Sequence, residues 1–209
     1  MTGRLQPIPV PVWSIGELME IPDAGFPLLN VEIAGGIADR LAREAYGSPH
    51  LMQEFCRGLC IEEKVKETAS SPIRIARIKN SLFKKIAEGT GKVVFDKLAK
   101  GPRQRSDRKP RPLNSGGEAD IYRVVLLALA KLAPGMERVN YESLRAAIRE
   151  ALAGEIPQAH EVSRVLDKMS EIASSDEAST PVIDWDKKDQ ELHITDLFFA
   201  FFLKWGVET

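Results

Sequence analysis

Residues 45–52 read Ala-Tyr-Gly-Ser-Pro-His-Leu-Met, and this stretch decides how the first half of the chain folds. Apolar residues recur at helical spacing on both sides of it, which predicts two helices joined by a corner. Gly47 can take the left-handed conformation that ends a helix, Ser48 can cap the next helix, and Pro49 suits its first position. We expect the corner to expose the proline ring and unpaired helix-start N–H groups, a surface on which a flat ligand such as a purine can lie.

The segment upstream of this corner starts with prolines at every second position from Pro7. Prolines cannot donate ladder hydrogen bonds, so residues 5–12 are predicted to form an edge strand or a tether. Ser14 and Glu17 then match a capping box, which predicts a short helix that ends before Pro22. Residues 26–31 are interpreted as a loop with apolar anchors.

The sequence Gly47-Ser48-Pro49 on the second of two short helices resembles the Gly-x-Pro motif in the helical lid of STAND-type ATPases, a branch of the AAA+ class. In that family the proline packs near the adenine of the bound nucleotide. The resemblance implies that Gly47, Ser48, Pro49 and His50 contact the base of ATP or ADP. A helical hairpin with a capped second helix and no ligand explains the same residues equally simply.

Residues 72–100 contain apolar residues at helical spacing, interrupted by Gly89-Thr90-Gly91-Lys92. A phosphate-binding loop would need a glycine five residues before Gly91 and Ser or Thr after Lys92. The chain has Ile86 and Val93 at these positions, so we expect a turn between two helices instead. The first domain is therefore predicted to span residues 1–100, with the strand or tether followed by a small helical lid bundle.

Residues 101–117 are the strongest candidate for a domain boundary, because proline, glycine and polar residues predominate there. This linker also concentrates basic residues, namely Arg103, Arg105, Arg108, Lys109 and Arg111. Such a segment is typical either of an arm that contacts phosphates or of a solvated linker held open by charge repulsion.

Residues 118–209 contain three amphipathic stretches of helical period, over 118–132, 141–152 and 158–173. Two strand-like runs follow around a polar turn at residues 186–189, and an aromatic helix capped by Thr195 or Asp196 closes the chain. This order predicts a winged helix-turn-helix domain with a β-hairpin wing. It resembles the winged-helix domain that follows the lid in archaeal-type and STAND ATPases, so the expected fold class is mainly α.

The parts that catalyse phosphoryl transfer are missing from the sequence. It has no Gly-x-x-x-x-Gly-Lys-Ser/Thr loop and no hydrophobic strand ending in Asp-Glu, and phosphoryl transfer depends on both. We therefore expect a non-catalytic lid and winged-helix module, with no catalytic residue, metal site or cofactor of its own. ATP or ADP would bind only with a P-loop ATPase core from another segment or a separate chain, which is the partner that the resemblance implies.

Two other functions remain open. A winged-helix DNA-binding protein would use the basic linker together with Arg164, Lys168, Lys187 and Lys188 on the third helix and the wing, although acidic and basic residues nearly cancel on that helix. A protein–protein interaction module, in a homo-oligomer or with a protein effector, suits such a mixed surface better.

Composition sets limits on the class of protein. The 209 residues are 44% hydrophobic, enough for two small domains, and 29 basic against 30 acidic side chains give a net charge of −1. This balance disfavours attraction of the whole protein to nucleic acid or anionic membranes. Cys56 and Cys60 are predicted to be core residues of a reducing compartment. Without a signal-peptide pattern or a long apolar run, the expected location is the cytoplasm, with no membrane contact.

Overall fold

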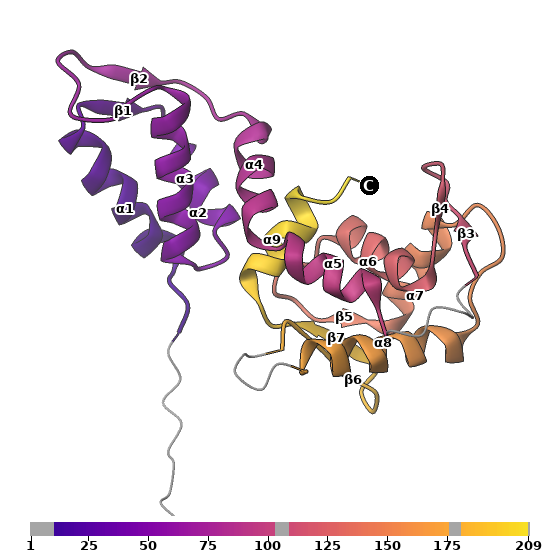
Figure 1. The fold of residues 1–209 in the computed structure, drawn as a ribbon. Helices are drawn as coiled ribbons and strands as arrows, with labels where there is room; N and C mark the ends of the chain where they lie inside the picture. Colours follow the sequence, from indigo (N-terminus) through magenta and orange to yellow (C-terminus); the bar gives the residue numbers. More distant parts are fainter. Residues whose placement is uncertain (1–10, 103–108, 176–180, 209) are drawn as a thin grey trace, which may run out of the picture. The chain divides into compact units, whose positions relative to one another are not determined.

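The computed structural model describes residues 11–102, 109–175 and 181–208, and this part of the chain is mainly α, as expected, with nine helices and three small sheets (Figure 1). Its internal contacts separate it into two compact units, Met1–Ile78 and Lys79–Thr209.

The first unit packs three helices with a two-stranded parallel sheet. Its elements are α1 (Ile15–Leu28), β1 (Val31–Ile33), α2 (Ile37–Glu44), α3 (Pro49–Glu62) and β2 (Ile73–Ile75). Val31 lies opposite Ile73, and the chain passes from β1 to β2 through α2 and α3. The fully buried side chains come from all three helices and include Leu18, Leu41, Leu51, Met52, Phe55 and Leu59.

Helix α1 is longer than the sequence predicts. The capping box is confirmed, since the Ser14 N–H donates to Glu17 Oε2 (2.7 Å) and the Ser14 side chain accepts from the Glu17 N–H. The predicted stop before Pro22 is wrong, because the helix continues to Leu28 with Pro22 inside it. Leu18, Pro22 and Phe26 follow at four-residue spacing and are all buried, so packing of this stripe outweighs the helical hydrogen bonds that proline removes.

The prediction for the neighbouring segments changes accordingly. The end of α1 and the start of β1 replace the loop expected over residues 26–31. The edge strand or tether expected over residues 5–12 lies, as far as residue 10, outside the described residues.

The described residues of the second unit form six helices and two small antiparallel sheets (Figure 1). Its elements are α4 (Asn80–Thr90), α5 (Lys92–Lys100), β3 (Arg111–Pro112), β4 (Glu118–Ala119), α6 (Ile121–Leu132), β5 (Val139–Asn140), α7 (Tyr141–Ala151), α8 (Ala159–Ala173), β6 (Ile183–Asp186), β7 (Glu191–Ile194) and α9 (Leu197–Trp205). Helices α6, α7 and α8 and the hairpin β6–β7 occupy the stretches where the sequence predicts three helices and a hairpin.

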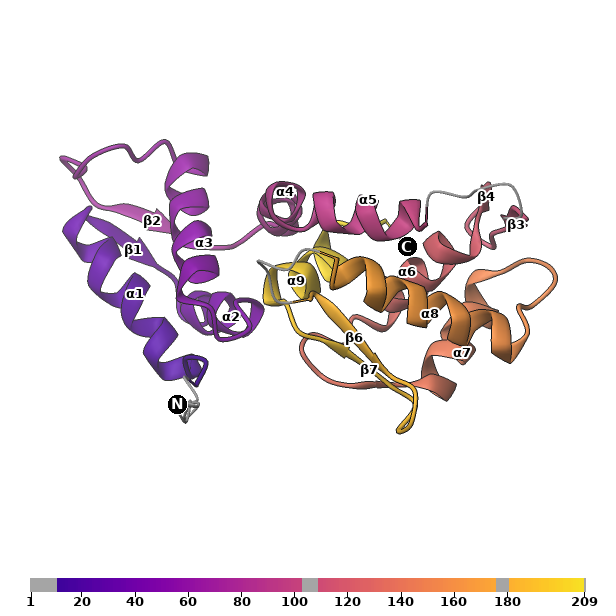
Figure 2. The same cartoon turned by 60° about the horizontal axis from the view of Figure 1, so that its bottom comes forward.

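The larger sheet of this unit has the strand order β5-β7-β6, with every pair antiparallel. Leu192 on the central strand lies between Val139 and Trp185. Figure 2 shows α8 running alongside the β6–β7 hairpin. Strand β5 is only two residues long, and no pattern in the sequence predicts it.

The structure places the division of the chain earlier than the sequence suggests. Instead of a first domain over residues 1–100, the boundary falls after Ile78, because α4 and α5 pack against α6 and α9. The rings of Phe83 and Trp205 are 4.8 Å apart, and those of Phe95 and Phe202 are 5.4 Å apart. The segment 101–117 therefore joins elements of one unit.

Aromatic side chains of α9 supply the partner surface for that packing. The helix is capped by Asp196, one of the two residues predicted for this role, whose Oδ1 accepts a hydrogen bond from the Phe199 N–H (2.6 Å). Phe199, Phe201 and Phe202 are buried, and Phe202 lies directly against Gly91 at the α4–α5 corner. Gly91 ends α4 and begins α5, which agrees with a turn rather than a phosphate-binding loop.

Candidate functional site

The corner between α2 and α3 has the backbone that the sequence predicts. Gly47 has a φ of 77°, in the left-handed region where a side chain would be strained. Ser48 caps α3, since its Oγ accepts a hydrogen bond from the Leu51 N–H (3.2 Å), and Pro49 occupies the first turn. The local features of the corner therefore agree with the residues that form it, namely Gly47, Ser48 and Pro49.

The four predicted base-contacting residues differ in how accessible they are. Ser48 is buried, with 6% of its surface exposed, whereas Gly47 and Pro49 are half-buried and His50 is exposed. Pro49 and His50 are thus the two whose side chains a ligand can reach, while Gly47 and Ser48 shape the backbone beneath them.

The helix start offers fewer donors than expected. The Leu51 N–H is bonded to Ser48 Oγ, the Met52 N–H is bonded to the Ser48 carbonyl (3.1 Å), and Pro49 has no N–H. The Leu51 and Met52 N–H groups are therefore not the unpaired donors expected from the sequence, because the Ser48 side chain and the Ser48 carbonyl accept from them. What the corner presents to a ligand is the half-buried Pro49 and the exposed His50.

The segment before α1 contacts the corner at Gly47, a contact that no local pattern at the corner predicts. The Trp13 N–H donates to the Gly47 carbonyl (3.0 Å). A Cβ at residue 47 would lie 2.6 Å from the Val12 Cβ, so Val12 packs where only glycine leaves room. Both side chains are nevertheless exposed, Val12 by 68% and Trp13 by 43%. Exposed apolar residues just before a capping box are the sequence signal that could have revealed this contact.

The titratable groups near the corner show no activated nucleophile. Burial raises the pKa of the Cys56 thiol to about 12 and that of Cys60 above its ordinary value. Burial also raises the pKa of Tyr46 to about 12, with Glu44 adding to the effect. The Arg57 guanidinium, bonded to Glu54 (Nε to Oε1, 3.1 Å), lowers the pKa of that carboxyl. These thiols stay protonated at neutral pH, in keeping with a packing role.

The second group of predicted residues lies in the second unit, on α8 and at the tip of the β6–β7 hairpin. Lys168 is paired with Glu171 (2.6 Å) and Lys187 with Asp167 (3.3 Å). Arg164 and Lys188 are exposed. Asp186 shapes the hairpin turn by accepting from the Lys188 and Asp189 N–H groups, and these bonds lower its pKa. Half of the predicted cations on this face therefore already have acidic partners.

The linker residues are divided between described and undescribed positions. Arg103, Arg105 and Arg108 lie outside the described residues. Lys109 is exposed and paired with Glu155 (2.8 Å). Arg111 is buried, with 7% of its surface exposed, and donates to the Glu155 carbonyl (3.1 Å) and to Glu161 (3.3 Å). The structure thus gives Arg111 a structural position, fastening β3 to the start of α8, in place of the phosphate contact that the sequence suggested.

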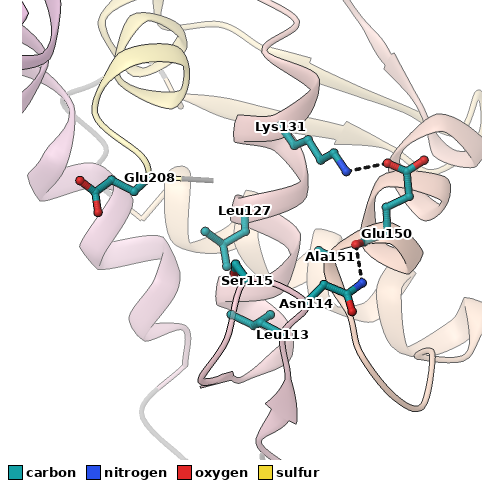
Figure 3. A pocket seen from close by; sticks show the side chains of 8 residues that line it. All are labelled: Leu113, Asn114, Ser115, Leu127, Lys131, Glu150, Ala151 and Glu208. Atoms are coloured by element: carbon teal, nitrogen blue, oxygen red, sulfur yellow. Dashed lines mark hydrogen bonds and ion pairs between the residues drawn. The ribbon is translucent and has the colours of Figure 1, made fainter.

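A pocket of about 280 Å³ lies elsewhere in the second unit, between the β3–β4 turn and helices α6 and α7 (Figure 3). The Asn114 amide donates to the backbone carbonyls of Glu150 (2.8 Å) and Leu152 (3.0 Å), and Lys131 pairs with Glu150 (2.7 Å). These bonds join the polar side chains of Asn114, Lys131 and Glu150 to the wall of the pocket. None of the predicted site residues lines it.

No three His, Cys, Asp or Glu residues are grouped so that they could hold a metal ion in the ranges that the structure describes. Within the same ranges, no helix has both the length and the apolar character needed to cross a bilayer. Comparisons with protein-family models, with curated proteins and with solved structures find no match to this chain.

Proposed function

We propose that this chain is the lid and winged-helix part of a STAND/AAA+-type ATP-binding protein. It would contribute adenine contacts from the first unit and a macromolecular contact surface from the second. In this proposal the phosphates are held by a P-loop core in another segment or chain. The chain itself would form no catalytic site and work inside the cytoplasm.

The observation that carries the proposal is the accessibility of Pro49 and His50 on a corner whose backbone is fixed from within. Ser48 and the cap bond to Leu51 hold the helix start, and Trp13 holds the Gly47 carbonyl. A preformed apolar ring with a neighbouring polar side chain suits one face and one edge of a purine. Because these groups are already ordered, binding would cost little conformational entropy.

The second unit supports the winged-helix half of the proposal through its connectivity. Between residues 121 and 194 the order is helix, short strand, two helices and a hairpin. The short strand β5 pairs with β7, the second strand of the hairpin, so β7 lies between β5 and β6. In a helix-turn-helix of this kind α7 and α8 form the two-helix motif, and α8 is the helix that would face a partner. The ion pairs on α8 favour a protein partner, since they leave little net positive charge.

A titration of the isotopically labelled full chain with ADP tests the adenine contact. We expect the backbone amide signals of Ser48, His50 and Leu51 to shift at millimolar ADP, because a lid without its phosphate-binding core holds only the base. Substitution Pro49→Ala should weaken this response about threefold to tenfold, as expected for loss of roughly 1 kcal/mol of apolar contact.

Pro27→Ala is the matched control, because Pro27 is an exposed proline of the same unit outside the corner. It should leave the ADP response unchanged. The proposal would be wrong if these three amides did not respond to ADP, or if Pro49→Ala and Pro27→Ala behaved alike. With magnesium and ATP, the purified chain should show no phosphate release above buffer.

DNA binding is the second candidate function, and the exposed Arg164 and Lys188 favour it. Their two charges would make duplex affinity depend on salt. If DNA is the ligand, the double substitution Arg164→Glu and Lys188→Glu should abolish a band shift seen at low ionic strength. If the band shift persists in the doubly substituted chain, or if the unaltered chain gives no band shift, a protein partner is the better interpretation.

A further inference from the structure

The first unit displays a group of exposed apolar side chains at the start of α1. Val12, Trp13 and Ile15 are 68%, 43% and 38% exposed. Single exposed apolar residues are ordinary, but several within four positions mark a contact surface. The other two tryptophans of the chain are used in packing, since the ring of Trp185 lies 5.7 Å from that of Tyr141 and the ring of Trp205 lies 4.8 Å from that of Phe83. Trp13 is the most exposed of the three.

This apolar group is fixed to the corner at residues 47–49. The Trp13 N–H donates to the Gly47 carbonyl (3.0 Å), and the Val12 side chain occupies the space that a Cβ at residue 47 would fill. On its other side the Ser14 capping box holds the same segment to α1. The backbone of Trp13 is therefore anchored on both sides. Gly47, which accepts its hydrogen bond, lies two residues before Pro49 in the chain.

We propose that Trp13 is a second base-contacting residue of the corner and that its indole stacks on the purine whose other contact is Pro49. This inference rests on the proposed function and adds a residue that determines its specificity. The ligand class is a nucleotide with a large, flat base, because stacking energy grows with ring area. Gly47 then has two roles, since it turns the chain and also leaves room for the segment that carries the indole.

Chemical arguments favour stacking over a purely packing role for this indole. A tryptophan with nearly half its surface in water gains from contact with a flat apolar face. Base–aromatic stacking contributes substantially to binding at sites that hold nucleic-acid bases. Its backbone is already anchored, so only the side-chain torsions need to be ordered on binding.

The test compares AMP with ribose 5-phosphate, which lacks the base, in titrations of the isotopically labelled full chain. The three indole N–H signals are observed directly, and Trp13→Phe identifies the one from Trp13. We expect AMP to shift the Trp13 indole and the His50 amide along one saturation curve, while the Trp185 and Trp205 indoles stay in place. Ribose 5-phosphate should move neither signal.

Substitutions at residue 13 give the quantitative arm of the test. Trp13→Ala should raise the Kd for AMP about tenfold, and Trp13→Phe, which keeps a ring, by less than about threefold. Leu28→Ala removes an exposed apolar side chain at the last residue of α1 and should leave the Kd unchanged.

The inference is wrong, and the proposed function stands, if AMP shifts the His50 amide signal but leaves the Trp13 indole signal in place. In that outcome the Kd of Trp13→Ala for AMP would equal that of the unaltered chain. If neither His50 nor Trp13 responds to AMP, the proposed function fails and the inference fails with it.

Discussion

The two units each contain a helix–helix corner centred on a glycine, and the two corners are used differently. At the α2–α3 corner, Gly47 has a positive φ and is followed by a side-chain cap and an accessible proline. At the α4–α5 corner, Gly91 has a φ of −109° and α5 has no side-chain cap. Phe202 of α9 lies against Gly91, so the second corner is part of the core.

Both glycines are required because a side chain from another segment occupies the place that a Cβ would take. The two corners differ in how exposed that contacting side chain is. Phe202 is a buried residue of α9, so its contact with Gly91 serves packing alone. Val12 remains largely exposed after its contact with Gly47, so that contact also positions a surface. At these two corners the glycine allows another segment to approach closely. The contacting side chain is buried at the core corner, where it is Phe202, and exposed at the candidate site, where it is Val12.

The largest expected effect is from Gly91→Ala. The new Cβ would lie 2.3 Å from the Phe202 Cβ and 3.2 Å from the Phe198 carbonyl oxygen, so α9 would have to shift. We expect a loss of about 2–3 kcal/mol in the free energy of unfolding, typical of overpacking a core, measured by urea denaturation.

Gly89→Ala is the control for this substitution, because a Cβ there has no neighbour within 4 Å and the residue lies in helix α4. It should stabilise the protein by roughly 0.5–1 kcal/mol. Equal effects of the two substitutions would show that the Gly91 contact is not tight and would remove the difference between the corners.

An intermediate effect is expected from Gly47→Ala, which combines a strained backbone with a Cβ 2.6 Å from Val12. Since Val12 is exposed and can move, we expect a loss of about 1–2 kcal/mol in the free energy of unfolding. Gly36→Ala isolates the backbone part, because Gly36 also has a positive φ (84°) but no neighbour within 4 Å. A larger loss for Gly36→Ala than for Gly47→Ala would contradict tight packing of Val12 on the corner.

The smallest effect concerns pH and the segment that covers the Gly47 corner. Hydrogen bonds from the Ser14 backbone and side chain lower the pKa of Glu17 below its ordinary value of 4.5. The ionised carboxylate therefore adds stability that is fully present above pH 4.5 and is lost as the pH falls through the lowered pKa. Thermal unfolding of the unaltered chain and of Glu17→Gln should differ slightly at pH 7 and converge at the acidic end. A constant difference down to that end would show that the capping carboxylate is not the cause.

Sequence predicted the local features of the structure better than its packing. Asn140 caps α7 and Ser48 caps α3, because a cap depends on residues three positions apart. The end of α1 was missed, since burial of Pro22 between Leu18 and Phe26 is a tertiary effect. Strand β5 is too short to show a period, and its pairing with β7 depends on the chain fifty residues later.

The candidate site was predicted in part for the same reason. The corner and its accessible proline follow from adjacent residues, whereas the contact of Val12 and Trp13 with Gly47 joins segments more than thirty residues apart. Arg111 was assigned to a basic arm on composition, but its partners Glu155 and Glu161 belong to the α7–α8 region. Charge counted along a chain does not reveal which charges are already paired.

The packing of α4 and α5 onto α9 has a practical consequence for anyone who divides this protein. A recombinant piece beginning at residue 101, where composition alone would place the cut, would strip Phe83 and Phe95 from Trp205 and Phe202 and leave an aromatic helix face open to aggregation. Proteolytic nicking between residues 102 and 110 should have the opposite outcome, since the two resulting fragments would stay associated through that same face.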